Sequence, residues 1–80
     1  MVEAKVIFIF KGENVTVQCS NSEIMKDICL KYTKKINKNL ESLLFLYEES
    51  IIDLQLTFQE LANTNDIDKN EIEISVFIKG

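Results

Sequence analysis

Residues 6–19 read VIFIFKGENVTVQC, two apolar runs on either side of a short polar break. Within both runs, apolar side chains recur at every second position, which is the period of a strand with one buried face. The break contains Gly12, and glycine readily adopts the positive φ that a tight turn between antiparallel strands needs. The stretch therefore predicts a β-hairpin with strands over residues 6–10 and 15–19.

The pairing of side chains across this hairpin indicates its buried face. If Phe10 pairs with Val15 across a four-residue connection, every pair on that face is apolar, and we expect the face to lie in the core. The opposite face carries two large aliphatic side chains, Ile7 and Ile9, which a solvent-facing surface does not require. The other expected core pairs are Phe8–Val17 and Val6–Cys19.

A segment with helical periodicity follows from Ser22 to Ile36. Its apolar residues recur at intervals of three and four, as in an amphipathic helix with one buried stripe. Ser20 with Glu23 three residues later fits a capping box, and Asn37 or Asn39 can end the helix because asparagine tolerates left-handed geometry. The expected stripe consists of Ile24, Met25, Ile28, Cys29, Tyr32 and Ile36.

Two further strands are predicted in the second half of the chain. Residues 43–47, LLFLY, place Leu44 and Leu46 on the face opposite to that of their three neighbours. Residues 72–78 alternate in the same way and are expected to expose Phe77. The residues that this last strand is expected to bury are Ile72, Ile74, Val76 and Ile78.

The segment between those strands carries weaker signals. Ile51 and Ile52 are consistent with a short edge strand. Thr57, with Glu60 three residues later, predicts a short capped helical turn that ends near residue 63. Residues 63–70 are polar and read as a loop that Ile67 anchors.

Length and composition indicate a single domain over residues 1–80. The chain has 80 residues, of which 46% are hydrophobic, and this share is enough for a core. No apolar run approaches the roughly 20 residues that span a bilayer, and no secretory signal pattern begins the sequence. We therefore expect no membrane contact and an intracellular, reducing location, cytoplasmic or nuclear.

The charge of the chain argues against a nucleic-acid partner. The formal net charge is −4 and there is no arginine, whereas phosphate recognition favours a basic surface rich in arginine. A lysine cluster on and after the helix reads as a solvated face that complements the helix dipole, with a weak site for an acidic partner as the alternative. It consists of Lys26, Lys31, Lys34, Lys35 and Lys38.

The residue types that catalysis and metal binding need are missing or poorly placed. There is no histidine, and Cys19 and Cys29 do not have the spacing of a metal site. Both read as buried free thiols, with a redox pair or a disulfide as the alternative. Glu48 and Glu49 lie in a predicted exposed turn, and two glycines do not make a phosphate-binding loop. We therefore predict no enzyme activity, no cofactor, no metal and no small-molecule substrate.

The order of strand, strand, helix, strand, short strand, short helix and strand resembles the β-grasp of ubiquitin over residues 5–79. The resemblance implies a divergent ubiquitin-like domain of the α+β class, with a mixed four- to five-stranded sheet and one main helix across one face. A sequence rich in Lys, Asn and Ile, without Pro or Arg, indicates a eukaryotic source with an AT-rich genome. The positions that look like ubiquitin's core are Val15, Val17, Cys19, Met25, Ile28, Tyr32, Leu43, Leu44, Phe45, Thr57, Phe58, Ile72, Ile74, Val76 and Ile78.

Ubiquitin's partners mostly bind an apolar patch on the outer face of its sheet. Here Leu44 matches the central aliphatic residue of that patch and Ile9 its neighbour in the hairpin, but Glu73 and Ser75 stand where ubiquitin has an imidazole and an aliphatic side chain. The resemblance therefore implies a patch of altered composition that docks a protein partner, or that another part of the same protein covers. The expected patch consists of Ile7, Ile9, Leu44, Leu46 and Phe77.

Conjugation is the other property that the resemblance raises, because ubiquitin-like modifiers end in a flexible di-glycine tail. This sequence ends in Lys79 and a single glycine, Gly80, so we expect an interaction domain that is not conjugated. A covalent modifier or sulfur carrier, whose di-glycine tail lies beyond these residues, is the alternative. A GTPase-binding relative of the fold is disfavoured because the second strand presents Thr16 and Gln18 and no arginine.

Overall fold

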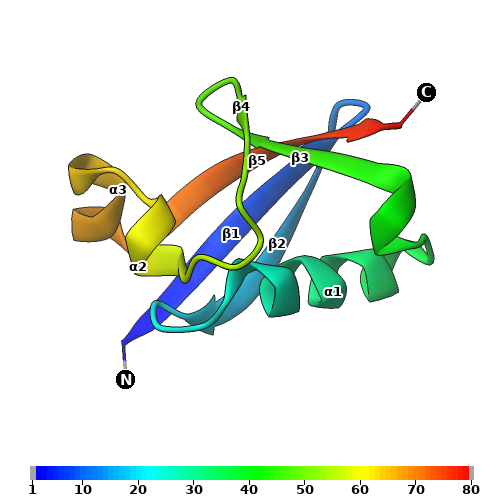
Figure 1. Ribbon diagram of the computed structural model, residues 1–80. Helices are drawn as coiled ribbons and strands as arrows, with labels where there is room; N and C mark the ends of the chain where they lie inside the picture. Colours follow the sequence, from blue (N-terminus) through cyan, green and yellow to red (C-terminus); the bar gives the residue numbers. More distant parts are fainter. Residues whose placement is uncertain (1, 80) are drawn as a thin grey trace.

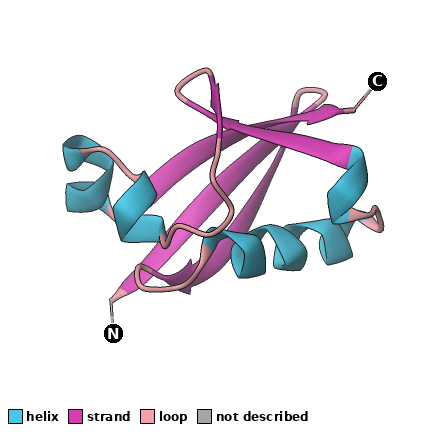
Figure 2. Cartoon of the chain, viewed as in Figure 1, coloured by secondary structure: helices cyan, strands magenta, loops and turns pink. Residues whose placement is uncertain are grey.

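The computed structural model describes residues 2–79, and it contains one mixed five-stranded sheet (Figure 1). The strands lie in the order β2-β1-β5-β3-β4, and α1 crosses one face of the sheet while α2 and α3 lie at one end (Figure 2). The predicted α+β architecture is therefore confirmed. The elements are β1 (Glu3–Phe10), β2 (Glu13–Ser20), α1 (Met25–Ile36), the 3-10 helix η1 (Leu40–Ser42), β3 (Leu43–Tyr47), β4 (Ser50–Ile51), α2 (Phe58–Leu61), α3 (Thr64–Lys69) and β5 (Glu71–Ile78).

The β1–β2 hairpin has a two-residue turn, not the predicted four-residue connection. Phe10 pairs with Glu13, so the pairing differs by two residues from the expected one with Val15. Lys11 and Gly12 both have positive φ, 51° and 80°, as in the type I′ turn that fits the twist of paired strands. A shift of two residues leaves every side chain on its own face, so the predicted faces are confirmed although the register is wrong.

The helix α1 begins at Met25, three residues later than predicted. Ser20 is instead the last residue of β2, and its backbone N–H donates at 3.3 Å to the carboxylate of Glu23 in the loop before the helix. Ile24 was expected in the buried stripe but is 41% exposed, because the chain there is extended and bridges to the segment before α2. Asn37 ends the helix in the left-handed conformation, as predicted.

Residues that were predicted to form a polar loop instead form α3. The Asn63 side chain accepts a hydrogen bond from the Asp66 backbone N–H at 2.8 Å, and Asn70 ends the helix with φ 52°. Asparagine caps at both ends therefore stabilise a short helix that apolar periodicity does not reveal. Ile67 is 38% exposed and is not the expected anchor. The capping box predicted at Thr57 is present at the start of α2.

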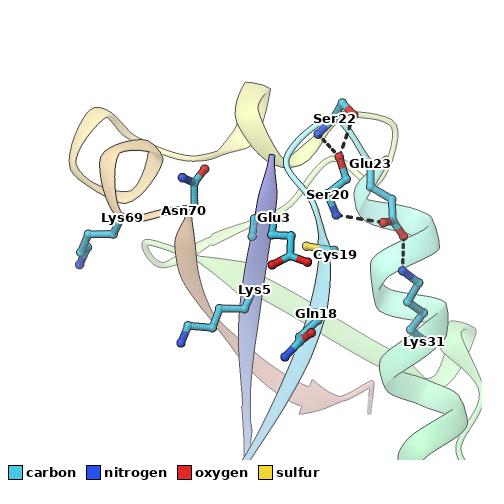
Figure 3. A pocket seen from close by; sticks show the side chains of 11 residues that line it. Glu3, Lys5, Gln18, Cys19, Ser20, Ser22, Glu23, Lys31, Lys69 and Asn70 are labelled. Atoms are coloured by element: carbon cyan, nitrogen blue, oxygen red, sulfur yellow. Dashed lines mark hydrogen bonds and ion pairs between the residues drawn. The ribbon is translucent and has the colours of Figure 1, made fainter. Parts of the chain in front are cut away.

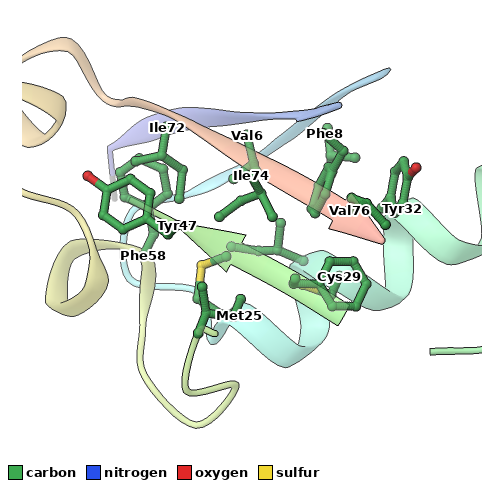
Figure 4. Close-up of a cluster of buried hydrophobic side chains, with 14 of the residues drawn as sticks. Val6, Phe8, Met25, Cys29, Tyr32, Tyr47, Phe58, Ile72, Ile74 and Val76 are labelled. Carbon is green, nitrogen blue, oxygen red and sulfur yellow. The ribbon is translucent and has the colours of Figure 1, made fainter. Parts of the chain in front are cut away.

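The core lies between α1 and the inner face of the sheet, and Phe8 of β1 is one of its buried side chains (Figure 4). The Phe8 ring stacks on Tyr32 with 4.2 Å between ring centroids and meets Phe45 edge to face at 6.0 Å. Two residues that were expected in the core lie outside it. Leu44 lies on the other face of the sheet, and Ile78, at the end of β5, is 50% exposed. The most deeply buried residues are Val6, Phe8, Val17, Met25, Ile28, Cys29, Tyr32, Phe58, Ile72 and Ile74.

The Tyr32 hydroxyl is buried and has no hydrogen-bond partner among the described residues. An unpaired buried hydroxyl destabilises a protein by about 1–3 kcal/mol. Because phenylalanine retains the stacked ring, we expect Tyr32→Phe to raise the free energy of unfolding by about 1 kcal/mol in urea denaturation. A clear loss of stability would contradict this expectation and would show that the hydroxyl is satisfied.

Candidate functional site

The face of the sheet opposite α1 carries a row of side chains from four strands. Ile9 of β1 lies opposite Ser75 of β5, Ser75 lies opposite Leu46 of β3, and Leu46 lies opposite Ile51 of β4. A groove on this face begins at Ser75, where Ile9 and Leu46 border it, and extends past Glu73 and Glu71 to Asp66 and Lys69 of α3. We call the apolar surface around this groove the outer patch, which consists of Ile7, Ile9, Leu44, Leu46, Ile51 and Phe77.

All five residues predicted for the binding patch lie on this face, but the structure brings only two of them into the groove. Ile9 and Leu46 line it. Ile7 lies two residues before Ile9 on β1, and Leu44 pairs with Phe77 on the other side of the row. Phe77 is 53% exposed, whereas the other four side chains are half-buried.

Ile51 is the patch residue that sequence reasoning missed. It pairs with Leu46 on the same face and is 67% exposed, while its neighbour Ile52 is buried. The strand β4 has two residues, too few for an alternating pattern. The available signal was the adjacent pair of isoleucines, because consecutive strand residues face opposite sides of a sheet.

Acidic side chains surround the groove, which is lined by five carboxylates and one ammonium group. That ammonium group, of Lys69, lies 3.6 Å from the Asp66 carboxylate, and Glu71 pairs with Lys5 at 3.5 Å. These two surface ion pairs are weak, but they partly neutralise the carboxylates of Asp66 and Glu71. The lining carboxylates that have no ion-pair partner within residues 2–79 are Glu48, Glu49 and Glu73.

Tyr47 holds α3 at the edge of the groove. Its hydroxyl donates to the Asp66 carboxylate and accepts from the Asn63 backbone N–H at 2.9 Å. Burial, with the nearby carboxylates of Asp66 and Glu48, raises the pKa of Tyr47 to about 12, although the Asn63 hydrogen bond opposes the rise. The hydroxyl therefore stays protonated at neutral pH and keeps donating to α3.

The turn between β3 and β4 consists of Glu48 and Glu49, with φ 51° and 68°. Positive φ destabilises a residue with a side chain by about 1–2 kcal/mol, and a pair of like charges adds to the strain. Asparagine followed by glycine is the favoured pair for such a turn. The sequence instead places two carboxylates beside the groove.

A second, larger hollow lies beside β1, β2 and the loop before α1 (Figure 3). Cys19 lines it as a free thiol, and burial, helped by Glu23 and opposed by Lys31, raises the pKa of Cys19 to about 11. Because thiols react as thiolates, Cys19 is a weak nucleophile at neutral pH. Glu23 and Lys31 pair with each other at 2.7 Å. This hollow therefore gives no support to the redox alternative.

Within residues 2–79, no three His, Cys, Asp or Glu side chains are grouped so as to hold a metal ion. None of the helices in the same residues is long and apolar enough to cross a membrane. The expectation about a single C-terminal glycine concerns Gly80, which lies outside the described residues.

Solved structures match this arrangement of helix and sheet over almost the whole chain. Caldiarchaeum subterraneum ubiquitin superposes with a TM-score of 0.81 at 7% identity, covering 99% of this chain and 96% of that one. The chain has the ubiquitin-like fold. The ubiquitin-like domain of Arabidopsis thaliana At2g32350 gives 0.79 at 20% identity, covering 100% and 81%, and that of yeast Ddi1 gives 0.76 at 13%, covering 98% and 91%. No family model and no curated protein matches the sequence.

These identities of 7–20% mean that the ubiquitin-like fold is shared while most side chains differ. The suspected likeness to ubiquitin is therefore confirmed for the architecture. The composition of the outer patch and its acidic surroundings belongs to this sequence, and its function has to be argued from its own residues.

Proposed function

We propose that this ubiquitin-like domain is a non-catalytic interaction module that docks a partner protein, or another domain of its own chain, through the outer patch. The row of Ile9, Ser75, Leu46 and Ile51 carries the proposal. It presents aliphatic side chains from three strands around a small serine, on a face that α1 leaves open. Contiguous exposed apolar area of this kind typically marks an interface.

The chemistry of the remaining residues supports binding without catalysis. The chain has no histidine, and burial keeps both cysteine thiols protonated at neutral pH, with the pKa of Cys29 raised to about 12. The unpaired carboxylates Glu48, Glu49 and Glu73 are exposed to solvent. An acidic groove in a chain without arginine also disfavours nucleic acid. The proposed partner is therefore a protein, with no cofactor, metal or small-molecule substrate.

Leu46→Asn tests this docking role without changing charge. We expect the variant to stay folded by circular dichroism, because Leu46 is only half-buried, and to lose about tenfold or more in affinity, as for a central interface residue. The measurement is quantitative capture of partners from a lysate of the source cells, with wild-type protein and variant side by side.

Gln18→Asn is the matched control, because Gln18 is exposed on the same face of the sheet but lies on β2, where it pairs with Lys5 and not with a residue of the outer patch. Proteins captured by wild type and by this control, and lost with Leu46→Asn, are the expected result. Equal capture by all three proteins would contradict docking at this site.

A further inference from the structure

The charge around the groove indicates the partner's chemistry if the outer patch docks a protein as proposed. Exposed lysines lie on α1, which covers the other face of the sheet. The groove itself is lined by five carboxylates and only Lys69 as a cation, and Lys69 already pairs with Asp66. Among the described residues, the charge at the groove is therefore predominantly negative.

The three carboxylates without an ion-pair partner among the described residues lie along one side of the apolar row, and Glu48 accepts a hydrogen bond from the Asn63 side chain at 3.1 Å. Glu73 precedes Ser75 by two residues on β5, and Glu48 follows Leu46 by two residues on the antiparallel strand β3, so both lie on the same side. Glu49 completes the turn beside them. The opposite side of the row is apolar, because Leu44 and Phe77 pair there. On the acidic side, Ile7 of β1 pairs with Glu73. The surface thus has an apolar floor with carboxylates along one side, over β5 and the turn between β3 and β4.

The dimensions of this surface suit an α-helix laid across the strands. Neighbouring strands lie about 4.8 Å apart, so a row over four strands is about 14 Å long. One helical turn rises about 5.4 Å, so successive turns of a crossing helix set one apolar side chain over each strand. Ser75, between Ile9 and Leu46, has the smallest side chain of the row, so the central one of these side chains would lie over it.

We propose that the outer patch docks an amphipathic helix of a partner protein that carries lysine or arginine along one edge of its apolar stripe. The stripe packs on Ile9, Leu46 and Ile51, while the cations meet Glu48, Glu49 and Glu73. A helix with an acidic edge sets like charges against these carboxylates and is rejected. Charge therefore selects among helices that the apolar floor alone accepts equally.

Three synthetic helical peptides of about 16 residues test this inference. They share one leucine stripe and carry lysine, glutamine or glutamate along one edge. In amide chemical-shift titrations of the 80-residue chain at about 20 mM salt, we expect the lysine peptide to bind about tenfold more tightly than the glutamine peptide and to shift the signals of Ile9, Leu46 and Ser75. The advantage should shrink at about 300 mM salt, because salt screens exposed charges.

The possible results of this titration distinguish the inference about the partner's charge from the proposal that the outer patch docks a protein. If the lysine and glutamine peptides shift these signals with equal affinity, the inference about charge is wrong and docking at the outer patch stands. If no peptide shifts them, the inference that the outer patch docks a helix is wrong, and the capture experiment with Leu46→Asn decides the docking role separately. Preferential binding of the glutamate peptide, with shifts confined to the lysines of α1, overturns the inference as well.

A pair of turn variants provides the matched comparison. Glu48→Asn with Glu49→Gly installs the favoured residues of a type I′ turn but removes the exposed hydrogen bond that the Asn63 side chain donates to Glu48. We therefore expect an equal or higher melting temperature and a lysine preference about threefold or more smaller. Lys11→Asn makes the corresponding change in the β1–β2 turn and should raise the melting temperature without reducing the preference. A lysine preference that survives the glutamate replacements undiminished overturns the inference.

Discussion

Replacing Phe8 with alanine is expected to lower the free energy of unfolding by about 3–5 kcal/mol. The side chain is 0% exposed, stacks on Tyr32 and meets the edge of Phe45, so its removal leaves a cavity between α1 and the sheet. A small domain has a total stability of about 5–10 kcal/mol. We therefore expect a thermal melt by circular dichroism to show an unfolding midpoint tens of degrees lower, with part of the protein unfolded at about 37 °C.

Phe77→Ala is the matched control on the opposite face. Phe77 is 53% exposed on β5, and truncating the same residue type there should change the free energy of unfolding by less than about 1 kcal/mol. The comparison also tests which face of the sheet is buried, on which the outer patch depends. Equal losses from the two substitutions would mean that the faces are assigned wrongly.

The buried face of β1 was predictable because alternation alone decides it, and a two-residue error in pairing does not alter it. The pairing itself was not predictable. The turn depends on Lys11 adopting φ 51°, a conformation that its side chain disfavours and that its sequence position does not indicate. The helix α3 was not predicted, because its ends are set by two asparagine caps and its sequence has no apolar residues at helical spacing.

The outer patch was predictable in part. Strand parity and the likeness to ubiquitin predicted its five aliphatic and aromatic members and the carboxylate of Glu73 beside them, but not Ile51 or the position of Glu48 and Glu49 at the same edge. Glu48 and Glu73 are 25 positions apart in the sequence and meet only because β3 and β5 are antiparallel neighbours. Strand order is long-range information, which the local pattern of either glutamate does not contain.

Raising the pH above 9 is expected to destabilise the domain steeply. Burial raises the pKa of the Cys29 thiol from 9.0 to about 12, and burial also raises the pKa of Tyr47 from 10.0 to about 12. The folded protein retains protons that the unfolded chain releases, so the stability from these groups is complete below pH 9 and is lost as the pH rises toward 12. For Cys29 alone, a shift of about three pH units corresponds to about 4 kcal/mol.

Cys29→Ala isolates the contribution of this thiol. The variant is expected to be less stable at neutral pH, because a buried side chain is truncated, but to lose about 2–3 kcal/mol less than wild type by about pH 11. Urea denaturation at each pH, with a reductant present, measures the difference. Lysine ionisation affects both proteins equally and does not contribute to it. Parallel losses would mean that the Cys29 thiol ionises as readily in the folded protein as in the unfolded chain, which is incompatible with its burial between α1 and the sheet.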